Sequence, residues 1–234
     1  MQKRSKKFKS LIKRTLSLFI PNSKYFWALR YWRKSYKKEG SQFNNRHYRK
    51  LMLAMAGEKD DSFTSGKVIA DFGCGPRGSL LWANSAKERI GIDVLTDAYV
   101  KRFKLRNQPM IYVQSTEYHI PMQDDSVDIL FTMNAMDHID NFDVICKEVT
   151  RIIKPGGYFI GSFNLDEPPT ETEPQTLTEE IVKLYLLNYL RIESYRIANK
   201  GPDGSIYANF FIPHQLNLSG PKCLWVKAKK PPTN

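Results

Sequence analysis

Short apolar runs, each followed by a turn signal, recur along the middle of this chain and limit its possible folds more than any other feature. Such runs are typical of strands buried in a parallel sheet. Before the last run, apolar residues at helical spacing end at a Pro-Gly-Gly turn, 155–157. This alternation predicts an α/β fold, a doubly wound and mostly parallel sheet with helices on both faces and ligands at the carboxyl ends of the strands. The expected strands are 67–73, 89–94, 109–115, 126–133 and 157–164.

The C-terminal part of the chain continues the pattern. Thr176, followed three residues later by Glu179, is typical of a capping box and predicts a helix over 177–190. Three further strand-like runs then follow, at 191–197, 205–212 and 223–229.

Length and cysteine content narrow the class of protein. A chain of 234 residues can bury one sizeable core, so we expect one domain with an appendage. Its three cysteines are scattered and form no C-x-x-C pair, which argues against a disulfide framework and a zinc site and for a reducing compartment. We therefore expect no metal and a cytoplasmic location. No apolar run approaches the roughly 20 residues that a membrane span requires.

Positive charge is concentrated at the N-terminus. Residues 1–50 hold 16 Lys and Arg and one acid, Glu39, whereas the remaining residues hold 20 basic and 23 acidic side chains. The net charge of +12 is thus a property of the N-terminal region. We expect a basic arm over 1–22, a helical cap over 23–65 and the main domain over 66–234.

The arm has large apolar residues near helical spacing among lysines, which predicts a basic amphipathic helix ending at Pro21. We expect residues 1–20 to contact an anionic membrane, at its inner face. In the cap, aromatic and basic residues alternate, a pattern that also suits RNA. We favour the interpretation that Trp27, Tyr31 and Trp32 pack onto the body and close a ligand site.

The glycine loop after the first predicted strand carries the strongest functional signal. Gly73, Gly75 and Gly78 match G-x-G-x-x-G, the signature of a pyrophosphate site. Two neighbours oppose that use, because Pro76 has no N–H to donate and Asp71 would place a carboxylate near the phosphates. The same carboxylate suits a ligand with an ammonium group, and a plain glycine turn capped by Asp71 is the alternative.

A second acid extends this hypothesis. Asp93 ends the next predicted strand, and its carboxylate could accept hydrogen bonds from both hydroxyls of a ribose. An amino acid joined to a nucleoside would satisfy both acids.

Four blocks occur in order: VIADFGCGPRG, RIGIDV, HIPMQDDSVDILFTMNAMDHI and EVTRIIKPGGYFI. Together they resemble the class I S-adenosylmethionine-dependent methyltransferases, from about residue 66 to the C-terminus. The resemblance implies a Rossmann-like sheet with one late antiparallel strand and S-adenosyl-L-methionine bound across the ends of the first strands.

The resemblance also implies roles for individual residues. Gly73 and Gly75 would admit the methionine portion of the cofactor, with Asp71 organising the loop. Gly78 falls one residue later than the third glycine of many relatives, where this chain has Arg77, which we expect to point to solvent rather than to the cofactor carboxylate. The remaining cofactor-binding residues would be Asp93 for the ribose, Val94, Leu95, Thr116 and Glu117 for the adenine, and Asn134 beside the transferable methyl group. Asn134 could also cap a helix, with Asp137 at its third position.

Methyl transfer to an alcohol needs a general base near the methyl group. His138 is the candidate catalytic base, with Asp137 as a second candidate or as its orienting partner, and a structural histidine is the alternative. The acidic stretch 164–177 could face the substrate, although we favour a solvated linker.

These observations predict an S-adenosylmethionine-dependent methyltransferase acting on a small molecule, or on a sugar of a surface glycan or lipid-linked precursor. One alternative is an RNA methyltransferase that uses the basic arm, but the sequence has no N-P-P-Y or D-P-P-Y motif. Another is a non-catalytic binding protein on the same fold.

Overall fold

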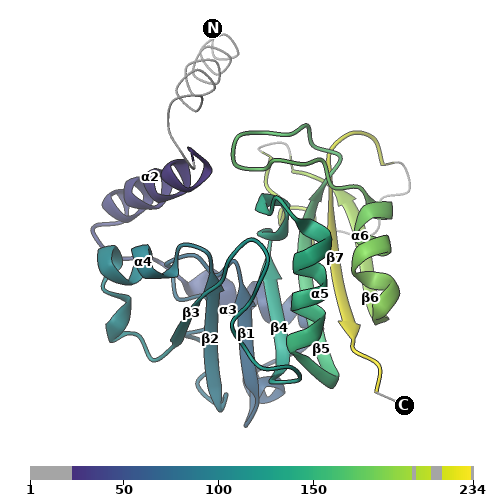
Figure 1. Cartoon of the computed structure of the whole chain (residues 1–234), viewed down its shortest axis with the longest axis horizontal. Helices are drawn as coiled ribbons and strands as arrows, with labels where there is room; N and C mark the ends of the chain where they lie inside the picture. The colour runs from purple at the N-terminus through teal and green to yellow at the C-terminus, as the bar shows by residue number, and fades with distance from the viewer. Residues whose placement is uncertain (1–22, 202–203, 212–217, 233–234) are drawn as a thin grey trace, which may run out of the picture.

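The computed structural model describes residues 23–201, 204–211 and 218–232, which form a seven-stranded sheet covered by helices on both faces (Figure 1). The strands span Val68–Phe72 (β1), Glu88–Asp93 (β2), Ile111–Gln114 (β3), Val127–Met133 (β4), Ile153–Leu165 (β5), Arg191–Asn199 (β6) and Lys222–Lys229 (β7). Their order in the sheet is β3-β2-β1-β4-β5-β7-β6. Strands β1 to β5 pair in parallel, and β7 is antiparallel to both β5 and β6. The predicted α/β fold with one late antiparallel strand is confirmed.

The helices form the outer layers. They span Ser23–Lys38 (α2), Arg46–Ala56 (α3), Thr96–Phe103 (α4), Phe142–Ile152 (α5) and Glu179–Tyr185 (α6). Helices α5 and α6 cover one face of the sheet and α3 covers the other, while α2 lies beyond the upper edge beside α4 (Figure 1). The cap predicted over 23–65 contains α2 and α3, and the predicted arm over 1–22 lies outside the described residues.

Both faces of the sheet are buried in apolar clusters. On one face Val149 of α5 packs in a cluster with Phe159 of β5, and on the other Met52 of α3 packs with Phe131 of β4; all four side chains are fully buried. Burying one side chain of this kind contributes about 1.5–3 kcal/mol. This burial on both faces explains why the strands read as continuous apolar runs rather than alternating ones.

The strand–helix alternation is incomplete between β1 and β2. Residues 73–87 form turns and contain no helix. Pro76 and the positive φ angles of Gly73, Gly75 and Gly78 (+74°, +54° and +71°) are incompatible with a regular helix at the start of this segment.

Two predictions in the C-terminal part are wrong. Residues 205–211 form turns rather than a strand, because Ile206, Tyr207 and Phe210 pack against the α3 face of the core instead of pairing with another strand. Helix α6 is capped by Thr178, whose hydroxyl accepts a hydrogen bond from the Ile181 N–H (3.3 Å). The hydroxyl of Thr176 instead donates to the carbonyl of Glu167 (2.7 Å).

Strand β1 is flanked by β2 on one side and β4 on the other, so the strand order reverses direction here. The loops that leave the carboxyl ends of β1 and β4 therefore diverge and leave a crevice, which is where ligands bind in open α/β sheets.

Candidate active site

A cavity of about 490 Å³ lies at this reversal point, between the carboxyl ends of the strands and helix α2. Residues from α2 form one wall, so the prediction that Trp27, Tyr31 and Trp32 help to close the site is confirmed. From the sheet side the cavity is lined by Asp71, Phe72, Gly73, Cys74, Gly75, Asp93, Val94, Leu95, Met133, Asn134, Ala135 and His138.

The first two glycines of the loop are required by close contacts. A Cβ atom on Gly73 would lie 2.1 Å from the Cβ of Ala135, and one on Gly75 would lie 2.8 Å from the Trp32 ring. Both residues have positive φ angles, which side chains rarely adopt. The absence of side chains at these two positions therefore lets Ala135 and the Trp32 ring pack directly against the loop backbone, at the edge of the cavity that both glycines line.

Gly78 and Arg77 lie outside the cavity lining. The Arg77 guanidinium pairs with both carboxylate oxygens of Glu39, directly after α2, at 2.6 and 2.7 Å. It also lies over the rings of Trp32 and Phe43, at 5.5 and 5.1 Å from their centroids. The expectation that Arg77 points to solvent is wrong, because its side chain joins the glycine loop to the helical cap.

The two predicted cofactor acids face the cavity in different environments. Asp71 is buried, and its carboxylate accepts a hydrogen bond from the Ser79 hydroxyl, which ties the two ends of the loop together. Burial raises the pKa of Asp71 to about 7, and the nearby Asp93 adds to this effect. The Asp93 carboxylate accepts hydrogen bonds from the backbone N–H groups of Leu95 (2.8 Å) and Gly75 (3.1 Å), and burial raises its pKa to about 6.

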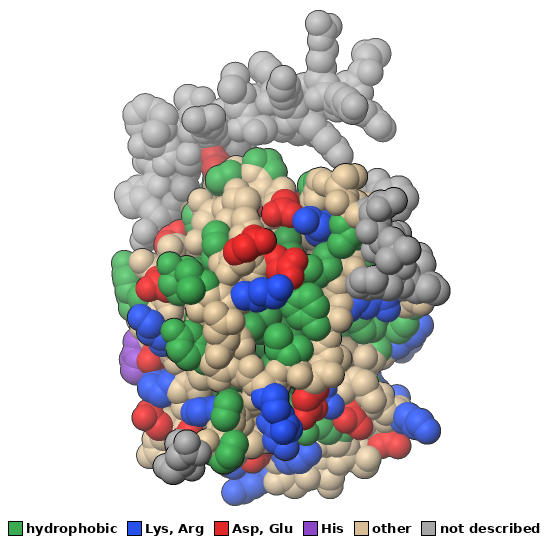
Figure 2. All heavy atoms as spheres, turned by 90° about the vertical axis from the view of Figure 1, so that its right-hand side faces the viewer, with side chains coloured by type: hydrophobic (Ala, Val, Ile, Leu, Met, Phe, Trp, Pro, Cys, Tyr) green, Lys and Arg blue, Asp and Glu red, His purple; other side chains and the backbone are tan. Residues whose placement is uncertain are grey.

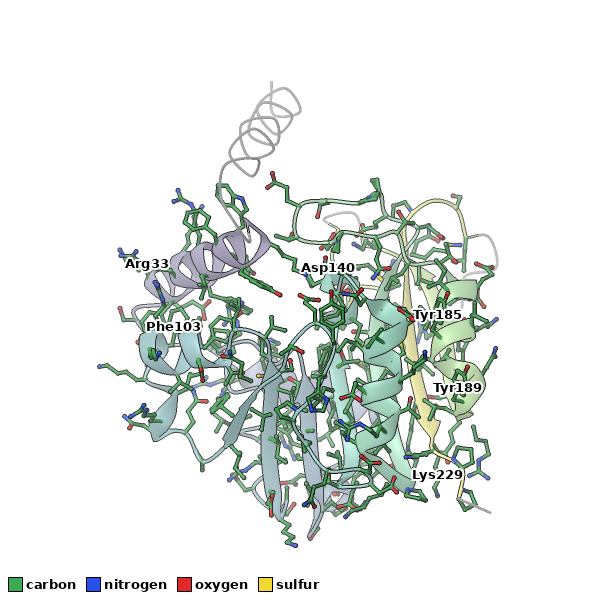
Figure 3. All side chains as sticks on the ribbon, in the orientation of Figure 1. Arg33, Phe103, Asp140, Tyr185, Tyr189 and Lys229 are labelled. Carbon is green, nitrogen blue, oxygen red and sulfur yellow. The ribbon has the colours of Figure 1, made fainter. Side chains whose placement is uncertain are left out.

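Glu117 lines the cavity, whereas Thr116 does not. The Glu117 carboxylate accepts hydrogen bonds from Lys24 (2.7 Å) and Tyr25 (2.5 Å) of α2. Burial raises the pKa of Glu117, but these two bonds outweigh that effect and hold the pKa below its usual range. Lys24 also donates to Asp140 (3.0 Å), which lies two residues before α5 (Figure 3).

Asn134 lies at the cavity in a strained backbone conformation, with φ at +53°. The short helix that follows, Met136–His138, begins after Ala135 without a side-chain cap, so the N-cap interpretation of Asn134 is wrong. Among the described residues, the buried Oδ1 atoms of Asn134 and Asp71 have a free acceptor position each. Two unpaired acceptors in a cavity that Gly73 and Gly75 also line fit the ammonium group of an amino-acid ligand.

His138 also lines the cavity, and a hydrogen bond to the backbone holds the orientation of its ring. Its Nδ1 lies 2.7 Å from the carbonyl oxygen of Thr172. Since a carbonyl only accepts, Nδ1 carries the proton and Nε2 of a neutral ring is left with a free lone pair. Nε2 lies 3.9 Å from Asp137 Oδ1 and 4.0 Å from Glu173 Oε1.

Asp137 stands behind His138 and outside the cavity lining. It is buried, which raises its pKa, and its Oδ2 accepts a hydrogen bond from Asn164 (2.8 Å). Donor atoms of Asp137, His138 and Glu173 lie within 4.8 Å of one another, a spacing that could also accommodate a divalent cation.

The stretch 164–177 is not a solvated linker. The carbonyl of Thr172 holds His138, Glu173 lines the cavity, and Gln175 donates to the carbonyl of Ile139 (2.5 Å). Sequence reasoning missed Thr172 and the α2 pair Lys24 and Tyr25 as parts of the site. It raised Glu173 only through the acids of the stretch 164–177, as the alternative to the linker that it favoured.

Comparisons with known proteins agree with this geometry. Residues 70–161 match the family model described as a methyltransferase domain. A fatty-acid O-methyltransferase of Mycolicibacterium smegmatis is 27% identical over 120 residues, which cover 50% of this chain and 43% of that protein. The chain spans 43% of the length of each of the first two curated relatives that it matches.

Solved structures share the fold at low sequence identity. An S-adenosylmethionine-dependent methyltransferase from Mesorhizobium loti superposes with a TM-score of 0.56 at 18% identity, covering 76% of this chain and 96% of that chain. The cyclase SpnF superposes with a TM-score of 0.60 at 14% identity, covering 79% and 81%.

The fold and the glycine cradle at the β1–β4 reversal define an α/β domain of the methyltransferase type. Over residues 70–161 the chain is similar to methyltransferases, and its fold is shared with an S-adenosylmethionine-dependent methyltransferase, so this similarity indicates S-adenosylmethionine as its cofactor. The free acceptors of Asp71 and Asn134, which line the cavity with Gly73 and Gly75, fit the amino-acid end of S-adenosylmethionine.

Proposed function

We propose that this chain transfers a methyl group from S-adenosylmethionine to a hydroxyl group of a small molecule, or of a sugar in a surface glycan or lipid-linked precursor. One observation carries the proposal: a single cavity joins the cradle of Gly73, Gly75 and Asp93 to His138, whose Nε2 is free.

The cofactor-binding roles follow from positions around the cavity. The backbone of Gly73 and Gly75 admits the methionine portion, and Asn134 and Asp71 offer acceptors to its ammonium group. Asp93 accepts hydrogen bonds from the ribose hydroxyls, while Val94 and Leu95 line the adenine side. Glu117 is already paired with α2, so we assign it the role of closing the adenine side rather than of binding the base through its carboxylate.

S-adenosylmethionine supplies a methyl group that is already activated by its positive sulfur, so positioning provides most of the rate enhancement. Nε2 of His138 would accept the proton of the acceptor hydroxyl as its oxygen takes up the methyl group, and His138 would hold this proton until water removes it. The Thr172 carbonyl keeps the ring in the productive tautomer, and the carboxylates of Asp137 and Glu173 stabilise the imidazolium that forms.

The surroundings of His138 support a neutral, hydroxyl-bearing acceptor. Glu173 and Asp137 give this end of the site negative charge, which disfavours a phosphate-rich substrate lying over it. The relative that acts on fatty acids also supports an acceptor that is small or attached to a lipid.

The test is transfer of radiolabelled methyl from S-adenosylmethionine into cell extract, fractionated into RNA, protein, lipid, glycan and small molecules. We expect label in the lipid, glycan or small-molecule fraction, and expect it to disappear in the His138→Gln variant. Label in RNA would assign the basic N-terminal region to RNA and replace this proposal with the RNA methyltransferase alternative. No label together with no binding of S-adenosylhomocysteine would support a non-catalytic protein.

A further inference from the structure

We propose that the outer face of helix α2 is a docking surface for an anionic phospholipid membrane. This basic face consists of Phe26, Leu29, Arg30, Arg33, Lys34 and Lys37 of α2 together with Arg102 of α4, and these residues line a groove of about 390 Å³. The proposal goes beyond methyl transfer, because it concerns a surface on the other side of α2 from the cofactor cavity.

The charge of the groove is of one sign. Five of its seven lining residues are Lys or Arg, and none is acidic. Helix α2 contains no Asp or Glu, and Arg33 extends outward from it, away from the sheet (Figure 3). On the face formed by α6 and β6, by contrast, basic and acidic side chains are interspersed (Figure 2). The basic face therefore attracts anions without competition from carboxylates lining the groove.

An exposed aromatic side chain accompanies this charge. Phe26 is 43% exposed and lines the groove with the partly buried Leu29. A helix that presents aromatic residues among cations can lie in the plane of the lipid headgroups, with rings among the acyl chains and cations at the phosphates. Leu29 packs against the cluster of Tyr99, Phe103 and Leu105, so Phe26 supplies the apolar contact of this face with the acyl chains.

Continuity along the chain adds to this argument. Residues 1–22, directly before α2, carry seven Lys and Arg and no acid in the sequence. The inner face of α2 contributes Trp27, Ala28 and Trp32 to the cofactor cavity. A membrane bound to the outer face would therefore lie within one helix diameter of the cavity.

The test is flotation of the full chain with phosphatidylcholine vesicles that contain or lack phosphatidylglycerol. We expect binding only to vesicles with phosphatidylglycerol, and a drop of at least about tenfold in partition coefficient for Arg30→Gln/Arg33→Gln/Lys34→Gln. The matched control is Lys59→Gln/Lys87→Gln/Lys147→Gln, which removes the same charge from exposed positions elsewhere.

Affinity for S-adenosylhomocysteine, measured by calorimetry, reports whether each variant is folded, and we expect it to be unchanged. Three results would overturn the proposal: no binding to anionic vesicles, equal partitioning of the two triple variants, or tighter binding of the basic face to single-stranded RNA than to vesicles.

Discussion

Arg77 of the glycine loop and Glu39 at the end of α2 form a two-bonded ion pair, with nitrogen–oxygen distances of 2.6 and 2.7 Å. The guanidinium holds the pKa of Glu39 down at about 2. At the other end of the same helix, Lys24 and Tyr25 bind Glu117. Helix α2, which forms one wall of the cofactor cavity, is thus held to the body of the protein by side-chain contacts at both ends.

The Glu39–Arg77 pair gives the first prediction. Glu39→Gln leaves the guanidinium without a charged partner, and we expect the affinity for S-adenosylhomocysteine to fall roughly three- to tenfold, since the pair is partly exposed. Limited proteolysis should cut within α2 faster than in the parent chain. Glu179→Gln, which breaks an exposed pair with Lys183, is the control and should change neither measurement.

The same pair has a pH dependence. A carboxyl whose pKa is lowered in the folded state stabilises the fold above its unfolded pKa, and this contribution is lost as the pH falls toward the folded value. For Glu39 the loss should occur between pH 4.5 and about 2. Acid unfolding of Glu39→Gln should therefore be shallower than that of the parent chain over this range.

Asp93 gives the second prediction. Asp93→Ala removes the acceptor for the ribose hydroxyls and the partner of the Gly75 N–H, and we expect the affinity for S-adenosylhomocysteine to fall by more than about tenfold. Calorimetry measures this directly. Asp97→Ala, an exposed acid four residues later, is the matched control, and an unchanged affinity in Asp93→Ala would exclude the ribose assignment.

The third prediction concerns His138. His138→Gln should lower kcat by about 100-fold or more while leaving the affinity for S-adenosylhomocysteine within a factor of about three, because a general base acts only on the reacting acceptor. His119→Gln removes an exposed histidine that is paired with Glu148 and should leave kcat unchanged. A similar kcat in the two variants would exclude His138 as the base.

Chelation distinguishes two roles for His138: a general base, or a ligand of a divalent cation together with Asp137 and Glu173. If Nε2 of His138 accepts a proton, methyl transfer should be insensitive to EDTA and to added Mg²⁺ or Mn²⁺. Loss of activity on chelation, restored by one of these ions, would show that Asp137, His138 and Glu173 hold a cation.

Asp71 gives the fourth prediction. Its pKa is raised from 3.8 to about 7 by burial, so ionisation of its carboxyl destabilises the folded state progressively as the pH rises through this range. Asp71→Asn keeps the shape and cannot ionise. Its melting temperature should approach that of the parent chain near pH 4 and exceed it increasingly toward pH 7, and a constant difference would contradict the assignment. Asp97→Asn is the control.

The sequence predicted most of the sheet because the central strands β1, β4, β5 and β7 are buried on both faces, and a continuous apolar run of that length is typical of such a strand. It failed at 205–211, where apolar residues cover the sheet instead of pairing. Whether an apolar segment pairs as a strand or packs over the sheet depends on which part of the sheet the other elements leave uncovered. The local spacing of apolar residues does not contain this information.

The candidate site was predictable where the backbone conformation and close contacts at one position allow only glycine, as at Gly73 and Gly75. It was not predictable where distant side chains meet. The pairing of Arg77 with Glu39 joins residues 38 positions apart, and the contact of His138 with the Thr172 carbonyl joins residues 34 apart. These contacts follow from the packing of α2 and of the 164–177 loop onto the sheet.

The ion pairs that hold both ends of α2, Glu39–Arg77 and Lys24–Glu117, have a consequence for the rate of turnover. Trp27 and Trp32 of this helix line the cofactor cavity, so we expect the helix to move each time the spent cofactor leaves. We therefore expect departure of S-adenosylhomocysteine, rather than bond formation, to limit the steady-state rate, and a burst of methylated product to precede that slower phase. Loosening either end of α2 would then raise turnover even while it weakens cofactor affinity.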